Sequence, residues 1–122
     1  MPWSYSQSTG QLTRNGVPLG RPGYSGAPEG QNNPNMQQVP NVGPIPRGTY
    51  RIGPPRSSSA RGPHVLDLTP VGHNALGRTA FLIHGERRDG PPGLASTGCI
   101  ILPLHIRQQV VASGDHELIV TE

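Results

Sequence analysis

The sequence has little of the material that usually stabilises or anchors a small protein. It contains a single cysteine, so no intramolecular disulfide can form. Aromatic residues make up only 4% of the chain and hydrophobic residues 32%, which limits the size of an apolar core. No apolar stretch reaches the roughly 20 residues that a membrane-spanning helix needs. The chain must therefore fold around a lean core without covalent cross-links.

Lysine is absent: all ten basic residues are arginine, and the formal net charge is +3. Nucleic-acid interfaces need a basic stripe and stacking rings, whereas these arginines are scattered and aromatics are few. We therefore expect no nucleic-acid partner. The two-pronged guanidinium also pairs with carboxylates, so an anionic peptide or glycan suits these arginines equally well.

The N-terminal residues Met1–Tyr5 lack a basic region followed by an apolar run, so they do not form a signal peptide. We predict a soluble chain made in the cytoplasm, with no membrane span. If the protein acts outside the cytoplasm, another machine must carry it there.

Fifteen prolines and 17 glycines exclude long helices and predict many short strands joined by turns. We expect a single domain over residues 1–122, mostly β, with one short helix that has Pro103 at its first position and ends near Gly114. Two stretches are predicted to be loops: residues 21–46, and the exposed proline- and serine-rich residues 54–59. The expected strands are a pair within residues 3–20, then 47–52, 65–69, 80–83, 99–102 and 117–121.

Two of these apolar runs meet a reactive residue at one end. Ala80–Ile83 leads into His84, and Cys99 leads into Ile100–Leu102. If the two strands are neighbours, His84 and Cys99 reach the same edge of the sheet. A thiol needs a nearby base because the thiolate is the nucleophile. We predict Cys99 as nucleophile and His84 as its base.

The residues before Cys99 fit the same chemistry. Gly98 lets a substrate approach the backbone closely. Backbone N–H groups of Gly98 and Cys99 are expected to stabilise a tetrahedral oxyanion. Ser96 and Thr97 are predicted to orient the histidine or the substrate.

His84, followed fifteen positions later by Cys99 within Ser96-Thr97-Gly98-Cys99-Ile100, resembles the signature of YkuD-type L,D-transpeptidases. The whole chain resembles the small L,D-transpeptidase-like effectors that bacterial type VI secretion delivers. The motifs that carry this likeness are Trp3-Ser4-Tyr5, Ser8-Thr9-Gly10-Gln11-Leu12, Gly23-Tyr24-Ser25-Gly26, Asn32-Asn33-Pro34, Gly43-Pro44-Ile45-Pro46-Arg47-Gly48-Thr49-Tyr50, Ile83-His84-Gly85 and Ser96-Thr97-Gly98-Cys99-Ile100.

The resemblance implies a β-sandwich or barrel-like domain with one short helix after the catalytic cysteine, and no cofactor. It implies that Cys99 attacks a peptidoglycan tetrapeptide stem before its terminal D-alanine. Transfer of the acyl group to water gives L,D-carboxypeptidase activity, transfer to a free D-amino acid gives exchange, and transfer to another stem gives a crosslink. In an effector, hydrolysis and exchange deprive a rival's wall of crosslinking donors.

Two positions depart from the general signature. Thr97 stands where the signature has histidine, and Ile101 stands where many relatives carry arginine or asparagine. The substrate carboxylate must therefore be bound from elsewhere. The candidate substrate-binding residues are Thr97, Tyr24, Arg47, Arg87 and Arg88, with Arg107 as a further candidate.

Other classes remain open. Cys99 is also compatible with an inert core residue in a non-catalytic module of a secretion system that binds the cell wall or has a structural role. A zinc peptidase fits poorly, because no histidine pair has His-Glu-x-x-His spacing and Cys99 has no Cys-x-x-Cys partner. We expect the remaining histidines to be structural or exposed, with loop residue His73 the one most able to enter a cleft; these are His64, His73, His105 and His116.

The predicted substrate lies in the periplasm, yet no export signal is present. We therefore expect delivery by a contact-dependent secretion system into a target bacterium. The partners would be the peptidoglycan stem peptide, components of the delivery machinery, and an immunity protein that protects the producing cell.

Overall fold

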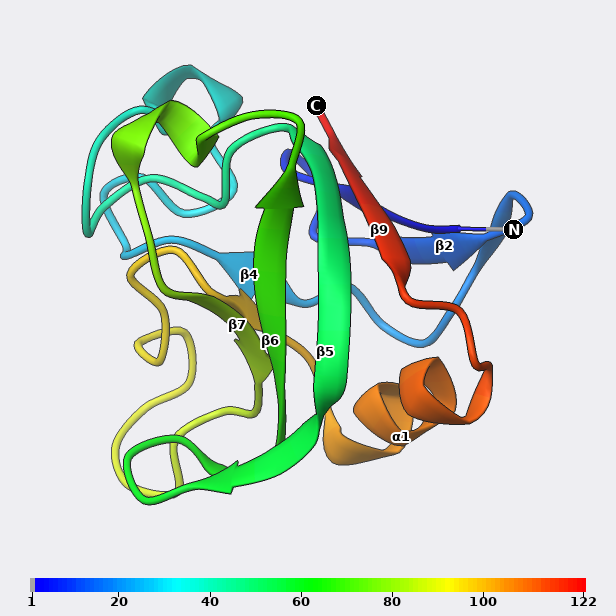
Figure 1. Ribbon diagram of the computed structural model, residues 1–122. Helices are drawn as coiled ribbons and strands as arrows, with labels where there is room; N and C mark the ends of the chain where they lie inside the picture. The colour runs from blue at the N-terminus through cyan, green and yellow to red at the C-terminus, as the bar shows by residue number, and fades with distance from the viewer. Residues whose placement is uncertain (1) are drawn as a thin grey trace.

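The computed structural model describes residues 2–122, which form a single open sheet of nine strands with one α-helix (Figure 1). The sheet order is β3-β2-β1-β9-β5-β6-β7-β8-β4, with β1 parallel to β9, β7 parallel to β8, and all other pairs antiparallel. The strands are β1 (Trp3–Ser6), β2 (Leu12–Arg14), β3 (Val17–Pro18), β4 (Tyr24–Ser25), β5 (Gly48–Ser58), β6 (Gly62–Val71), β7 (Phe81–His84), β8 (Ile100–Ile101) and β9 (Glu117–Thr121). The predicted fold class, mostly β with one short helix after Cys99, is confirmed.

The helix α1 (Leu104–Ala112) follows β8 directly. Pro103 lies at its N-cap, one position before the predicted one, and its carbonyl accepts the backbone N–H groups of Ile106 and Arg107. Gly114 takes a φ of +73° just after the helix, as a chain-reversing glycine does. The helix packs beside β6 and β7 and adds Ile106 and Val110 to the core. None of the described helices has the length and apolarity needed to cross a membrane.

The core lies on one face of the sheet. Alternate residues of each long strand point into it, as the two-residue period of a strand requires. Tyr50, near the start of β5, is fully buried and donates its hydroxyl to the carbonyl of Pro46 at 2.8 Å. The other core members include Trp3, Tyr5, Leu12, Ile45, Ile52, Leu66, Leu68, Phe81, Ile83, Ile100, Leu102, Leu118 and Val120.

The prediction of a loop at residues 54–59 is wrong, because most of these residues belong to strand β5. These residues are largely exposed, as expected, but β5 continues through Pro54 and Pro55 to Ser58. The pairing with β6 shifts register between Ile52 and Pro55, which marks a bulge. A bulge accommodates residues that cannot donate to the ladder, so the long partner strand holds a proline-rich segment in extended form. The other long loop, residues 21–46, contains only the short β4 and a three-residue helical turn, Pro34–Met36.

The buried face of β6 offers a stability test on a single strand. Leu66 is fully buried, whereas Val71 on the same strand is 52% exposed. We expect Leu66→Ala to lower the free energy of unfolding by about 2–5 kcal/mol through lost burial and a residual cavity. Val71→Ala should change it by less than about 0.5 kcal/mol. Urea denaturation of both variants measures the difference; equal effects would contradict this account of the core.

Candidate active site

The pairing of β7 with β8 determines where His84 and Cys99 lie. Ile83 pairs with Ile100 and His84 pairs with Ile101 in parallel register. Cys99, directly before Ile100, therefore lies beside Leu82, two residues before His84 on the neighbouring strand. Because side chains alternate along a strand, both Cys99 and His84 lie on the face opposite the core residues Ile83 and Ile100. They are therefore diagonal neighbours across this parallel pair.

The Cys99 thiol is 7% exposed and donates to the carbonyl oxygen of Ala80 at 3.8 Å. Burial raises its pKa above the ordinary value of a thiol. The backbone N–H of Leu82 and the positive charges of Arg61 and Arg78 oppose this rise. The thiol is consequently protonated at neutral pH in the resting protein.

The His84 side chain is 2% exposed. Its Nδ1 lies 2.9 Å from the carbonyl oxygen of the next residue, Gly85, and its buried Nε2 has no hydrogen-bond partner among residues 2–122. A carbonyl accepts only a proton-bearing nitrogen, so Nδ1 carries the hydrogen and Nε2 is the free base. Burial lowers the pKa of His84. The hydrogen bond to the Gly85 carbonyl raises this pKa, whereas the positive charges of Arg61 and Arg107 lower it further. The imidazole is therefore neutral and able to accept a proton.

Cys99 and His84 form no hydrogen bond with each other, since the thiol donates to Ala80 and Nε2 is unpaired. The resting state is thus a neutral thiol and a neutral imidazole on the same face of the sheet, with no hydrogen bond between them. Such an arrangement allows general-base activation of the thiol when a substrate arrives, instead of a preformed ion pair.

The turn before Cys99 is held by two buried serines. The Ser96 hydroxyl donates to the carbonyl of Cys99 at 2.6 Å and accepts the N–H groups of Gly26 and Gly98. The Ser25 hydroxyl donates to the carbonyl of Gly98 at 2.9 Å and accepts the N–H of Ile45. Ser96 therefore fixes the cysteine-bearing turn and makes no contact with His84, and the N–H of Gly98 is already used and is not free for an oxyanion.

Gly98 itself is required by close packing. Its φ is +151°, and a Cβ built there would lie 2.6 Å from a guanidinium nitrogen of Arg78 and 3.2 Å from the ring of Phe81. Any side chain at this position would displace Arg78. Gly98 thus has a steric role within the protein itself, which differs from the predicted access of substrate to the backbone.

Arg78 is a site residue that the sequence analysis missed. It is 9% exposed, and its two terminal nitrogens donate to the carbonyls of Gln37, Gly43, Pro44 and Thr97 at 2.6–3.2 Å.

Among the described residues, no carboxylate pairs with Arg78, whose partners are backbone carbonyls. The positive charge of Arg78 lowers the pKa of the Cys99 thiol. The turn that places it has left-handed backbone at Ala75, Leu76 and Ala80. No apolar pattern or motif in the sequence marks this turn.

Two cavities reach the two reactive residues separately. Cys99 lines a cavity of about 280 Å³ together with Thr97, Gly98, Arg78 and Phe81. His84 lines a larger one of about 610 Å³, whose wall also includes Arg61, Arg87, Arg88 and Arg107. Of the predicted substrate-binding residues, Thr97 thus lies at the thiol, and Arg87 and Arg88 lie at the imidazole.

Tyr24 lies in a third, apolar depression, next to Pro22, Ile101 and Leu102. Its hydroxyl donates to Glu86 at 2.6 Å and accepts the N–H of Ala95. Burial and the Glu86 carboxylate raise the pKa of Tyr24 to about 12. Tyr24 therefore anchors the loop that follows His84, a role that the sequence analysis did not assign to it.

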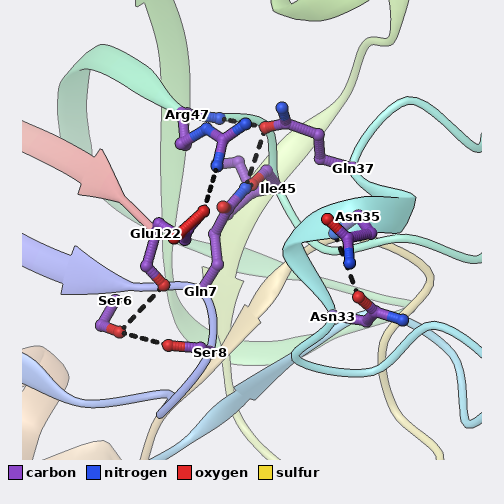
Figure 2. Close-up of polar contacts among 9 residues, drawn as sticks. All are labelled: Ser6, Gln7, Ser8, Asn33, Asn35, Gln37, Ile45, Arg47 and Glu122. Carbon is purple, nitrogen blue, oxygen red and sulfur yellow. Dashed lines mark hydrogen bonds and ion pairs between the residues drawn. The ribbon is translucent and has the colours of Figure 1, made fainter.

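Arg47 lines neither of the cavities at Cys99 and His84. Figure 2 shows its guanidinium paired with Glu122 at 3.2 Å and its backbone N–H donating to Gln37. The same side-chain oxygen of Gln37 accepts an N–H of the buried Gln7, which also donates to the carbonyl of Ile45. Arg47 thus belongs to a network that joins the chain end to the long loop, and we leave it out of the proposed site.

Of the other histidines, His105 and His116 are exposed, and His64 is half-buried with a ring Nε2 that has no hydrogen-bond partner among residues 2–122. His73 does not enter a cleft: its ring packs edge-on against Tyr50 with centroids 5.1 Å apart, and its nitrogens bond to backbone atoms of Thr49 and Ala75. Among residues 2–122, no group of three or more histidine, cysteine, aspartate or glutamate side chains is arranged to hold a metal ion.

The sequence matches the Tlde1 domain over residues 20–118, which is most of the chain. The chain belongs to the Tlde1 domain family. This confirms the predicted resemblance to the L,D-transpeptidase-like effectors of type VI secretion. A search of curated protein sequences finds no match.

Two solved structures share the fold of this Tlde1 domain. One is the carbamoyl enzyme that Ldtfm forms with avibactam, with a TM-score of 0.60, 12% identity, and coverage of 99% of this chain and 48% of that chain. The other is Bd1075 of Bdellovibrio bacteriovorus, with a TM-score of 0.65, 13% identity, and coverage of 98% and 47%. The chain spans about half the length of either structure, so these likenesses concern the fold alone.

The protonation state of the Tlde1 domain's thiol can be measured directly. Because burial raises the pKa of Cys99, we expect its alkylation rate by iodoacetamide to rise with pH, with a midpoint above that of the urea-unfolded chain. Arg78→Met should raise the midpoint further, since it removes a nearby positive charge. Mass spectrometry of the single cysteine follows the reaction. A midpoint well below that of the unfolded chain would instead indicate a resting thiolate–imidazolium pair.

The serine network gives a second test. Ser25→Ala leaves the carbonyl of Gly98 and the N–H of Ile45 without their buried partner, so we expect a loss of about 1–3 kcal/mol in the free energy of unfolding. The exposed Ser57→Ala serves as control and should change it by less than about 0.5 kcal/mol. Thermal and urea unfolding of both variants provide the comparison. A Ser25→Ala protein as stable as the control would show that this network does not hold the turn.

Proposed function

We propose that this chain is a cysteine enzyme that attacks peptidoglycan tetrapeptide stems through an acyl-enzyme on Cys99. The observation that carries the proposal is the register of β7 and β8, which puts the lone thiol and an imidazole with a free Nε2 on one face of the sheet. Membership of the Tlde1 family supports peptidoglycan as the substrate class.

In this mechanism the neutral His84 takes the thiol proton as sulfur attacks the carbonyl of the third stem residue. The protonated imidazole then gives that proton to the leaving D-alanine amine, and a thioester forms on Cys99. The low pKa of His84 favours this second transfer, because a weakly basic imidazole releases its proton readily. Arg78 stabilises negative charge that develops on sulfur before the carbon–sulfur bond is complete.

The fate of the thioester sets the activity. Water gives an L,D-carboxypeptidase, and a free D-amino acid gives exchange. Both outcomes remove the donors that a growing wall needs for crosslinks. We accordingly place the protein's action in the periplasm of a target bacterium, after delivery by a type VI secretion system, with an immunity protein as the partner in the producing cell.

One observation favours a second candidate function. Cys99 is only 7% exposed and makes no bond to His84, as a non-catalytic wall-binding module would also show. The role of the thiol separates the two candidates.

We expect purified tetrapeptide muropeptides to lose D-alanine when incubated with the protein, or to gain the mass of an added D-amino acid. Cys99→Ala should abolish both reactions. His84→Gln should slow them by roughly 10²–10⁴-fold, as removal of a general base does. His105→Gln, an exposed histidine on α1, is the matched control and should keep full activity. Mass spectrometry distinguishes hydrolysis, exchange and dimer formation.

A probe that needs no natural substrate completes this test. The carbamoyl enzyme of Ldtfm suggests avibactam, which should add covalently to the wild-type chain and leave Cys99→Ala unmodified. Release of D-alanine by a folded Cys99→Ala variant would refute the proposed mechanism. Wall binding without any turnover or adduct would favour the non-catalytic module.

A further inference from the structure

The cavity that reaches His84 lies between two segments far apart in the sequence. One wall is the tip of the β5–β6 hairpin, residues 59–63, and the other is the loop 85–89 after β7. Figure 1 shows this hairpin tip beside the yellow loop at the lower edge of the molecule. Pro103, Leu104 and Arg107, at the start of α1, also line it. Its volume of about 610 Å³ lies within the roughly 300–1,000 Å³ of small-molecule sites.

The charge of this cavity is unbalanced. Four arginines line it, against the two acidic side chains Glu86 and Asp89. The Glu86 carboxylate is already engaged by the Tyr24 hydroxyl and by the backbone N–H groups of Arg87 and Gly93. The Glu86 carboxylate therefore has its hydrogen-bond partners within the protein and does not balance the charge of the arginines toward a ligand.

The four arginines divide into two kinds. Arg107 is buried, and it donates to the carbonyls of Leu102, Pro63 and His64, so it braces the wall. Arg61, Arg87 and Arg88 are exposed, and within residues 2–122 none of the three forms an ion pair. Three unpaired guanidinium groups around one cavity make a site for a carboxylate.

The thiol opens into the other cavity, with Phe81, Thr97 and Arg78. The acyl group of the donor stem is attached to sulfur and belongs on that side. The molecule that His84 must deprotonate next is the acyl acceptor, and the cavity lined by His84 is the basic one.

We propose that the arginine-lined cavity binds the carboxylate of the acyl acceptor, and that it selects free amino acids, in which a carboxylate adjoins the reacting amine. This inference rests on the proposed function and names its second substrate. Arg61, Arg87 and Arg88 hold the carboxylate and thereby place the amine beside His84, which lines the same cavity. Water carries no carboxylate and gains nothing from these residues.

The transfer step balances without a further reactant. The amine nitrogen attacks the thioester carbonyl, a carbon–nitrogen bond forms, and the carbon–sulfur bond breaks. His84 takes one proton from the amine and returns it to the departing Cys99 thiolate. The products are the exchanged peptide and the free enzyme.

The test compares two acceptors that differ only in the carboxylate: D-methionine and D-methioninamide. With tetrapeptide muropeptides as donor, we expect the wild-type KM for D-methionine to be at least about tenfold lower than for the amide. A variant carrying Arg61→Gln, Arg87→Gln and Arg88→Gln should lose this preference, so that its KM values for the acid and the amide become equal within about twofold. Arg51→Gln, an exposed arginine outside the cavity, is the matched control and should keep the preference.

A binding measurement separates this inference from the proposed chemistry. NMR titration of the Cys99→Ala protein should show D-methionine binding at least about tenfold tighter than D-methioninamide, with the difference lost in the triple arginine variant. Equal use or equal binding of acid and amide by the wild-type cavity would overturn the inference, even if D-alanine release is normal. Absence of any turnover together with selective binding would overturn the proposed function and leave the amino-acid site in place.

Discussion

The parallel pairing of β7 with β8 is the constraint on which the candidate site depends. A parallel pair cannot be closed by a tight turn, so the fifteen positions from His84 to Cys99 must leave the sheet and return. That excursion builds the loop that Glu86 and Tyr24 anchor, and it ends in the turn that Ser96 and Ser25 hold. The register of two short strands thus sets the relative placement of thiol and base, and the intervening loop supplies one wall of the cavity at His84.

Electrostatics at the site has two opposing parts. Burial favours the neutral form of both Cys99 and His84, which raises the thiol pKa and lowers that of the imidazole. Arginines near both residues act differently on the two groups: Arg61 helps the thiolate and opposes the imidazolium. The consequence is a resting site without a fixed ion pair between Cys99 and His84.

Much of this arrangement was predictable from the sequence, and the failures have identifiable causes. The apolar runs before His84 and after Cys99 predicted two strands, because short, continuous runs of this kind are typical of buried strands. Their adjacency was a condition of the predicted site, and the parallel pairing of β7 with β8 meets it. Residues 54–59 were misassigned because proline content signals a loop locally, whereas pairing with a long partner strand overrides it through a bulge.

Arg78 and Glu86 escaped notice for a different reason. Their roles depend on carbonyls and hydroxyls from segments far away in the chain, such as Gly43 and Tyr24, and no local spacing encodes such contacts. Arg47 shows the converse: it belongs to a motif of the family resemblance, yet its partner is Glu122 at the other end of the sequence. The motif singled out Arg47 as a residue of interest, but it did not indicate which side chain Arg47 contacts.

The two ends of the sequence meet in the sheet, since β1 and β9 run parallel over four paired residues from Trp3–Leu118 to Ser6–Thr121. Force that pulls the chain apart by its ends therefore acts along these strands in opposite directions. The hydrogen bonds between them bear the load together in shear, and they cannot open one at a time as in a hairpin. In the sheet order this seam is separated by β5 and β6 from the pair β7 and β8, which carries the candidate site.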